Sequence, residues 1–332
     1  MSEPARYPFP SHASFYKRGH VRTKVVSILI IIVALVSLQW RSAEGSERPI
    51  AILVGADIAP YQSAAKGARE ALSGHRTLTY LLDESPDRML HTMEKVSLVS
   101  PRAVIAIGSQ AILALKANPI DAPVVFCLVI DHEDGLEVPQ SWGISMHPLP
   151  REAYDRIRQV FPRSRIAIPY NPERTGALVE ALVAHFRDTS IQLVPMIIRK
   201  PSEIAPVLRT MRSQFDALWL LPDGSFIDSL SARAIIEYSI DERLPILGFS
   251  EALTKNGAVL SVAGNYEDMG RQAAETARRV ISGERPLRIQ PPRQLDTFIN
   301  VRVARILNLP VGGTFLAFAD RIYPTDPDLR MP

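Results

Sequence analysis

Polar or small residues follow several short apolar runs in this sequence. They are Asp57, then Gly108, Ser109 and Gln110, then Asp131, Asn171, Asp223, Gly224, Ser225 and Ser250. Short apolar runs predict buried strands, and open α/β folds bind ligands at the carboxyl ends of such strands. We therefore expect several of these residues to contact one small ligand. Helix N-termini near Ser109 and Ser250 favour an anionic group on it. Helix capping and ordinary turns are the alternative roles for each residue.

Asp223 occupies the clearest of these positions. The stretch FDALWLLPDGSFIDS at 215–229 ends its apolar run at a Pro-Asp-Gly turn. This pattern predicts a strand, a ligand-facing turn and a helix. Two tyrosines at predicted helix starts, Tyr61 and Tyr266, could stack on a flat ligand or simply pack. Asn265, where a long helix begins after Gly264, completes the set of candidate ligand-binding residues.

Motifs for cofactor and catalytic chemistry are missing from the sequence. It contains no Gly-x-Gly-x-x-Gly, no Walker loop, no Gly-x-Ser-x-Gly and no His-Glu-x-x-His. We therefore expect no cofactor, no metal and no enzyme activity. The dense polar cluster Asp131-His132-Glu133-Asp134 is interpreted as a solvated turn, although a metal site or a hydrolase centre is the alternative. Cys127, the single cysteine, lies in an apolar run and is expected to be buried.

Length and composition fit a globular protein with two domains. The chain has 332 residues, 46% of them hydrophobic and 22% charged, with a formal net charge of +3. The basic residues are spread along the chain without interleaved aromatic residues, which argues against nucleic-acid binding.

The amino terminus has the pattern of an export signal. Basic residues, including Lys17, Arg18, Arg22 and Lys24, precede the apolar run 25–38, and Ala43-x-Gly45 resembles a signal-peptidase site. The run is short for a transmembrane helix, which favours cleavage. Gln39 and Trp40 could instead extend it into a retained membrane anchor covering residues 25–40. In both cases we expect the remainder of the chain to be periplasmic.

From Pro49 onward, apolar runs alternate with segments of helical spacing. This alternation requires parallel sheets, because a helical crossover returns the chain in the same direction. The rhythm restarts near Arg165, so we predict an α/β fold with two doubly wound parallel-sheet lobes joined by a hinge. The predicted divisions are 1–45 as signal peptide or anchor, 47–145 with 264–285 as lobe 1, 146–263 with 286–310 as lobe 2, and 311–332 as an irregular tail. Predicted hinge segments are 145–150, 262–265 and 284–292.

Several segments resemble those of ABC-transporter substrate-binding proteins with the type I periplasmic, branched-chain-amino-acid-binding-like fold. They are AVIAIGSQAILAL, PVVFCLVID, RIAIPYNPE, FDALWLLPDG and FINVRVARILNLPV, which follow in the family's order between about Ile50 and Val311. The resemblance implies ligand contacts from Gly108, Ser109, Asp131, Asn171 and Asp223. It also implies a ligand that is an amino acid, including aromatic ones, or another small polar molecule.

The resulting hypothesis is an exported solute-binding protein that closes its two lobes on a small polar, amino-acid-like ligand and presents it to an ABC importer permease. The alternative is a membrane-anchored sensing or interaction module that uses the same cleft without transport. A third possibility is an enzyme on this architecture that uses the acidic cluster at Asp131–Asp134.

Overall fold

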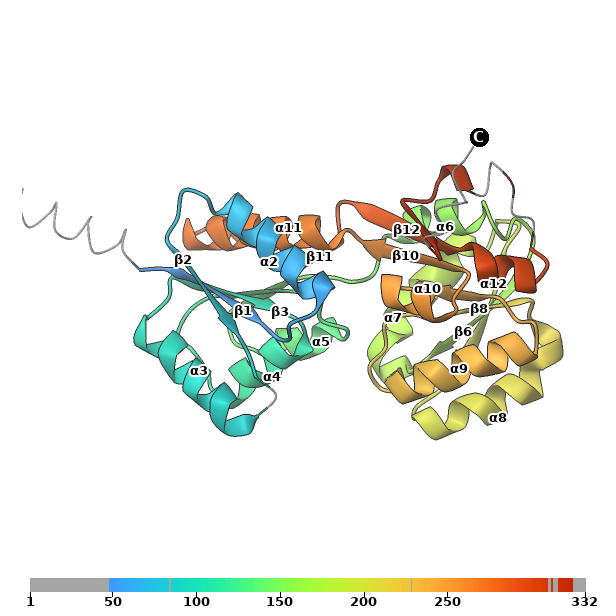
Figure 1. Cartoon of the computed structure of the whole chain (residues 1–332), viewed down its shortest axis with the longest axis horizontal. Coiled ribbons are helices and arrows are strands. Elements are labelled where there is room, and N and C mark those ends of the chain that lie inside the picture. The colour runs from blue at the N-terminus through green and yellow to red at the C-terminus, as the bar shows by residue number, and fades with distance from the viewer. Residues whose placement is uncertain (1–47, 84, 228, 310–311, 313–315, 325–332) are drawn as a thin grey trace, which may run out of the picture. The chain divides into compact units, whose positions relative to one another are not determined.

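A computed structural model describes residues 48–83, 85–227, 229–309, 312 and 316–324. The predicted signal or anchor segment lies outside the described residues. The chain from Pro49 onward forms one compact unit that contains two α/β lobes (Figure 1). Within the part of the chain that the structure describes, no helix is both long and apolar enough to span a bilayer.

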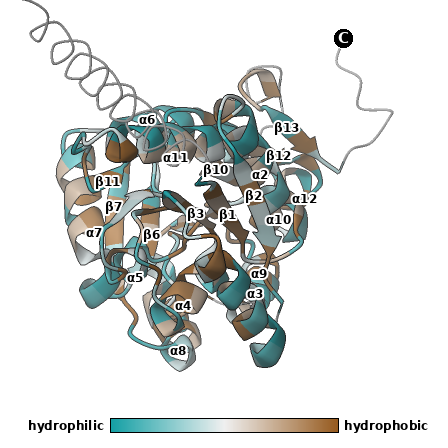
Figure 2. Cartoon of the chain, turned by 90° about the vertical axis from the view of Figure 1, so that its left-hand side faces the viewer, coloured by the Kyte–Doolittle hydropathy of each residue, from teal (hydrophilic) through white to brown (hydrophobic). Residues whose placement is uncertain are grey.

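The first lobe is built on a six-stranded sheet whose strands all run parallel. Its order is β11-β5-β4-β3-β1-β2. The strands are β1 (Ile50–Val54), β2 (Thr77–Leu81), β3 (Ala103–Ile107), β4 (Val124–Cys127), β5 (Ser141–Ile144) and β11 (Ile289–Gln290). β1 and β3 are interior strands of the sheet and are buried throughout, as their continuous apolar runs predict (Figure 2).

Helices cover both faces of the first sheet. One face packs against α2 (Ala59–Ala71) and α11 (Tyr266–Ile281), and the other against α3 (Pro86–Leu98) and α4 (Ser109–Ala117). The short helix α5 (His132–Leu136) follows β4. Cys127 is fully buried in the first of these layers, as expected, and burial raises the pKa of its thiol to about 12.

The second lobe contains a seven-stranded sheet of order β13-β12-β10-β9-β8-β6-β7. Its strands are β6 (Arg165–Tyr170), β7 (Gln192–Ile197), β8 (Ala217–Trp219), β9 (Ile246–Gly248), β10 (Leu260–Gly264), β12 (Leu295–Asn300) and β13 (Arg321–Tyr323). The pair β10–β12 is antiparallel and all other pairs are parallel. The antiparallel pair arises because β12 follows a direct crossing from the first lobe instead of a helical crossover.

Two helical layers also enclose the second sheet. α6 (Pro150–Ile157), α7 (Pro172–Phe186) and α12 (Val301–Ile306) pack on one face. α8 (Pro201–Met211), α9 (Ser229–Asp241) and α10 (Glu251–Asn256) pack on the other. Several helices begin at proline, whose missing N–H costs nothing at the first helical position. The structure thus confirms the predicted fold class of two parallel-sheet α/β lobes.

Three segments carry the chain between the lobes. They are residues 145–149 after β5, Asn265 between β10 and α11, and residues 291–294 between β11 and β12. The strand β11, predicted within lobe 2, pairs with β5 of the first sheet, while β12 joins the second sheet. The region predicted as an irregular tail contributes β13 to the second sheet.

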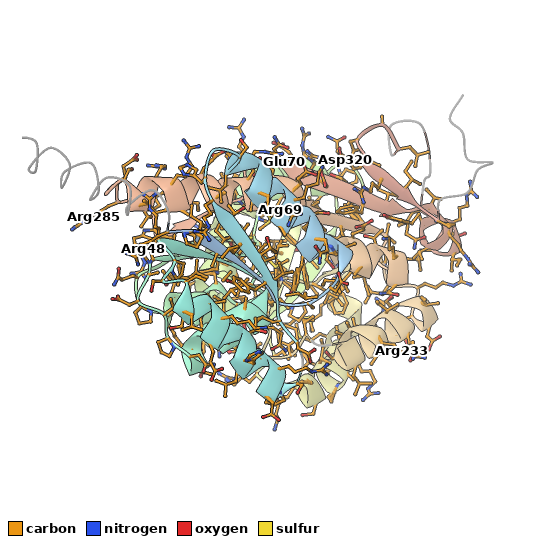
Figure 3. All side chains as sticks on the ribbon, turned by 60° about the vertical axis from the view of Figure 1, so that its left-hand side comes forward. Arg48, Arg69, Glu70, Arg233, Arg285 and Asp320 are labelled. Atoms are coloured by element: carbon orange, nitrogen blue, oxygen red, sulfur yellow. The ribbon has the colours of Figure 1, made fainter. Side chains whose placement is uncertain are left out.

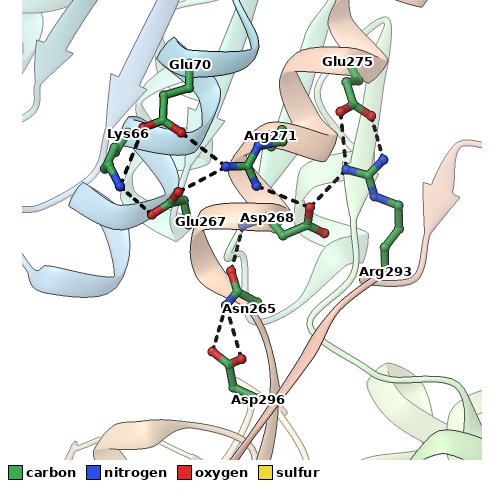
Figure 4. A network of polar contacts seen from close by, with 9 residues as sticks. All are labelled: Lys66, Glu70, Asn265, Glu267, Asp268, Arg271, Glu275, Arg293 and Asp296. Atoms are coloured by element: carbon green, nitrogen blue, oxygen red, sulfur yellow. Dashed lines mark hydrogen bonds and ion pairs between the residues drawn. The ribbon is translucent and has the colours of Figure 1, made fainter. Parts of the chain in front are cut away.

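Side chains on α11 and its neighbours hold the second and third crossing segments together (Figure 4). Asn265 Nδ2 donates to both carboxylate oxygens of Asp296, at 3.2 and 3.0 Å. Arg293 pairs with Glu275 at 2.7 Å and with the buried Asp268 at 3.2 Å. These contacts fix the segment 291–294 against α11. The third crossing segment is therefore held by a helix of the first lobe.

Close packing of α2 on α11 depends on glycine. A Cβ atom on Gly67 would overlap the carbonyl oxygen of Glu267, and one on Gly270 would overlap that of Ala64. The two backbones therefore approach more closely than any side chain allows. Ion pairs from Lys66 to Glu267 (2.9 Å) and from Arg271 to Glu70 (3.2 Å) flank this contact (Figure 4).

Candidate ligand-binding site

The carboxylate of Asp223 is fully buried in the turn that follows β8. Its Oδ2 accepts hydrogen bonds from the backbone N–H of Asn171 (2.9 Å) and from Thr175 Oγ1 (2.7 Å). Its Oδ1 accepts from the backbone N–H and the hydroxyl of Ser225, at 3.1 and 2.5 Å. All of these donors belong to the second lobe, and they fill the acceptor capacity of a carboxylate. Asp223 therefore organises the carboxyl edge of the second sheet by joining the turns after β6 and β8.

Asp131 links the two lobes directly. It lies at the carboxyl end of the first sheet, where its Oδ1 accepts a hydrogen bond of 3.0 Å from the backbone N–H of Gly224. The side chain of Asp131 is buried, and burial raises its pKa while the Gly224 bond partly offsets that rise. A second link pairs Arg174 with Asp134 at 3.1 Å. The carboxyl edges of the two sheets therefore face each other.

In the first lobe, the Tyr61 ring lies against the turn after β3. Gly108 has φ +88°, in the left-handed region that favours glycine, and a Cβ there would overlap the Tyr61 ring. Burial raises the pKa of the Tyr61 hydroxyl. Ser109 begins α4, and its Oγ accepts a bond of 3.5 Å from the backbone N–H of Ile130. Tyr61 therefore packs on the turn that leads into Ser109 at this edge.

Three further candidates use their side chains as helix N-caps. Asn171 accepts from Glu173 N (3.0 Å), Ser250 from Leu253 N (3.3 Å) and Asn265 from Asp268 N (2.9 Å). Capping is the alternative role that the sequence left open for these residues. Asp57 and Gln110 are exposed, and Asp57 accepts a bond of 2.9 Å from Gln62. A ligand contact by any of these residues stays a prediction.

Tyr266 reaches from the first lobe to the second. Its hydroxyl accepts a hydrogen bond of 3.4 Å from the backbone N–H of Glu251, at the start of α10. Burial raises the pKa of Tyr266 to about 12. Glu251 in turn pairs with Lys255 at 3.0 Å and with Arg321 at 3.1 Å, and Tyr323 donates to it. Tyr266 is therefore a packed interlobe residue in this structure.

The acidic cluster after β4 has protein partners for each of its carboxylates. Asp131 binds Gly224, Asp134 pairs with Arg174, and Glu133 lies 3.3 Å from His132 Nε2. Among the residues that the structure describes, no group of three His, Cys, Asp or Glu side chains is arranged to hold a metal ion.

His147 is a buried group that the sequence reasoning did not single out. It lies in the first crossing segment, and its Nδ1 has no hydrogen-bond partner among the described residues. Its ring lies 5.9 Å from the ring of His132, edge to face. His147 also lines a small cavity of about 20 Å³ at the carboxyl edge of the second sheet, with Trp219, Leu221 and Phe249 among the other lining residues. The sequence signal that could have identified His147 as a candidate is its position shortly after the strand β5.

Acid should destabilise the fold through His147. Burial, with His132 nearby, lowers the pKa of His147 from 6.5 to about 4. The unfolded chain then binds more protons between these values, so the free energy of unfolding falls as pH drops from 6.5 towards 4, by about 3 kcal/mol in total. Asp131, whose pKa is raised, acts with the opposite sign. Urea unfolding at several pH values should show that the free energy of unfolding falls less between pH 6.5 and 4 in His147→Asn than in the wild type. Equal pH dependence in both proteins would contradict this.

The sequence of this chain matches a known protein family. The family model described as ABC transporter substrate binding protein matches residues 82–322, which is more than half of the chain. A curated protein called tyrosine-binding protein, from Clostridioides difficile, is 20% identical over 191 residues. That match covers 54% of this chain and 55% of the relative, so the chain spans about half the length of the relative it matches.

Solved structures share the fold at low sequence identity. An ABC domain in complex with L-Trp from Streptococcus pneumonia has a TM-score of 0.59 and 18% identity, over 82% of this chain and 99% of that one. A substrate binding protein with adhesive properties from Clostridium difficile, ligand-free and open, has a TM-score of 0.62 and 15% identity, over 82% and 98%. A conserved domain protein from Vibrio cholerae has a TM-score of 0.60 and 19% identity, over 82% and 99%. With two facing lobes and this family match, the chain belongs to the ABC transporter substrate-binding proteins.

Proposed function

We propose that this protein binds an amino acid with an aromatic side chain between its lobes and delivers it to an ABC importer permease. The observation that carries the proposal is the meeting of the two carboxyl edges, joined by the bond of 3.0 Å from Gly224 N–H to Asp131. Polar groups and helix N-termini from both sheets converge there. Such a site holds a small polar ligand by contacts from each lobe.

The aromatic class is supported by the residues around this edge. Tyr61 is half-buried beside the turn after β3, and Phe249 is half-buried directly after β9 at the carboxyl edge of the second sheet. Flat rings favour stacked or edge-on contact with another ring. The tyrosine-binding relative and the L-Trp complex point to the same ligand class. The N-terminus of α4 at Ser109 would receive the ligand carboxylate.

Export to the periplasm accompanies this function. The apolar run at 25–38, with basic residues before it, would direct the chain across the inner membrane. Delivery then requires the permease to recognise the two lobes once they have closed by motion at the three crossing segments.

Thermal unfolding of the full chain tests the ligand class. L-tryptophan, L-tyrosine and L-phenylalanine should each raise the melting temperature as their concentration increases, because a ligand that binds only the folded state stabilises it. At a hundred times the dissociation constant the gain is about 2.7 kcal/mol. L-alanine, glucose and succinate serve as controls. A shift with glucose or succinate and none with the aromatic amino acids would refute the proposal.

A further inference from the structure

A basic hollow lies at the end of the first lobe opposite the candidate ligand site. It has a volume of about 560 Å³, and its lining includes His75, Arg102, Arg278 and Arg279. Arg102 precedes β3 and His75 precedes β2, so the hollow lies at the amino edge of the first sheet. The ligand-site residues follow the carboxyl ends of these parallel strands. The hollow and the candidate ligand site therefore lie at opposite edges of the first sheet.

The cations in this hollow outnumber the carboxylates that could neutralise them. Two carboxylates line it, and each already has a cationic partner: Glu284 pairs with Arg279 at 2.8 Å, and Glu275 pairs with Arg293 at 2.7 Å. No carboxylate of the described chain forms an ion pair with Arg102 or Arg278. The hollow thus presents a net positive surface to an anionic group.

Two exposed leucines lie at the same edge of the sheet as the hollow. Leu98, at the end of α3, is 83% exposed, and Leu287, just before β11, is 74% exposed. Both lie at the amino edge, since Leu98 shortly precedes β3 and β11 runs parallel to β5. Arg285, just beyond the end of α11, lies at this same end of the lobe (Figure 3). Exposed leucine beside arginine is the surface chemistry of proteins that rest on a membrane interface.

The sequence brings this same edge close to the predicted membrane segment. The apolar run with its aromatic extension ends at Trp40, and β1 begins at Ile50. The residues from Arg41 to Arg48 can span at most about 27 Å. If residues 25–40 are retained in the bilayer, the amino edge of the first sheet is the part of the lobe tied nearest to the lipid headgroups.

We propose that the amino edge of the first lobe, centred on Arg102 and Arg278, binds the headgroups of anionic phospholipids and seats the lobe on the membrane. The proposal rests on export and on retention of residues 25–40, but not on the identity of the solute. Seating this edge leaves the opposite, ligand-binding edge facing away from the lipid. The protein then works as a membrane-seated receptor instead of a diffusing one.

Lipid quenching of a fluorophore tests the proposal on the full chain. A bimane label is attached to Leu98→Cys, and the native Cys127 does not compete because it is fully buried. The protein is reconstituted into vesicles of brominated phosphatidylcholine, with or without phosphatidylglycerol. Label at Leu230→Cys, a residue of the second lobe that is 79% exposed, is the matched control.

We expect quenching at Leu98 in the phosphatidylglycerol vesicles, little in phosphatidylcholine alone, and none at Leu230. The double variant R102E/R278E should weaken this lipid contact about tenfold or more, because each basic residue adds to the attraction. The variant R102K/R278K should retain it. Both double variants should keep the wild-type melting temperature and its shift with aromatic amino acids, which separates a failure here from a failure of solute binding.

Three quenching results would each overturn the proposal. They are equal quenching in both lipid compositions, quenching unchanged by R102E/R278E, and quenching at Leu230 as strong as at Leu98. Inorganic phosphate is compared with chloride at equal ionic strength to distinguish lipid from a soluble anion. If phosphate displaces the lobe from vesicles more than chloride does, the hollow is a site for free phosphate and the lipid assignment is wrong.

Discussion

Replacing Asp223 with alanine should lower the free energy of unfolding by about 3–5 kcal/mol. The substitution leaves buried donors of Asn171, Thr175 and Ser225 without their acceptor. A hydrogen bond to a charged group contributes about 1.5–3 kcal/mol, and an unpaired buried donor costs about as much. Urea unfolding monitored by circular dichroism measures the loss.

Two further variants establish that the loss comes from these bonds. Asp223→Asn keeps an acceptor oxygen and should lose less stability than Asp223→Ala. Asp57→Ala removes an exposed carboxylate that accepts a hydrogen bond from Gln62, and it should change stability by about 0.5 kcal/mol or less. If Asp223→Ala unfolds at the wild-type urea concentration, the organising role of this carboxylate is wrong.

Gly270→Ala should destabilise the first lobe by about 3 kcal/mol or more. Its Cβ would overlap the backbone of Ala64, and backbone cannot turn aside as a flexible side chain can. α2 would have to move off α11, which would open the layer that covers one face of the first sheet. The urea midpoint of the variant measures the effect.

The matched control for Gly270→Ala is Gly74→Ala. A Cβ on Gly74 meets no atom within 4 Å, and Gly74 does not have a left-handed φ. This variant should unfold within about 0.5 kcal/mol of the wild type. Equal stability of Gly270→Ala and Gly74→Ala would show that the two helices are not held as closely as described.

The sequence was sufficient to predict the two α/β lobes because the local patterns are strong. Continuous apolar runs such as Ile50–Ala56 indicated buried parallel strands, and their alternation with helical spacing indicated the lobes. The antiparallel pairing of β12 with β10 was not predicted. The chain passes through the first lobe between these two strands, so their pairing depends on tertiary contacts and not on a local sequence pattern.

The candidate site was harder to predict than the fold. Polar residues after strands do lie at the sheet edges, and Asp131 with Gly224 even joins the two lobes. The sequence could not reveal that the Asp223 carboxylate accepts hydrogen bonds from Thr175 and Asn171, which lie 48 and 52 positions away along the chain. Nor could it show that His147 would be buried with an Nδ1 that finds no hydrogen-bond partner in the described part of the chain. Such facts depend on which distant backbone and side-chain atoms meet.

Calorimetric titration of L-tryptophan into the full chain tests whether a small ligand binds between the lobes. We predict saturable binding that is weakened about tenfold or more by Tyr61→Ala in the first lobe and likewise by Phe249→Ala in the second. Tyr238→Ala, on α9 away from the facing edges, should bind as the wild type does. Binding that depends on only one lobe, or no binding of any aromatic amino acid, would refute an aromatic-ligand site between the lobes.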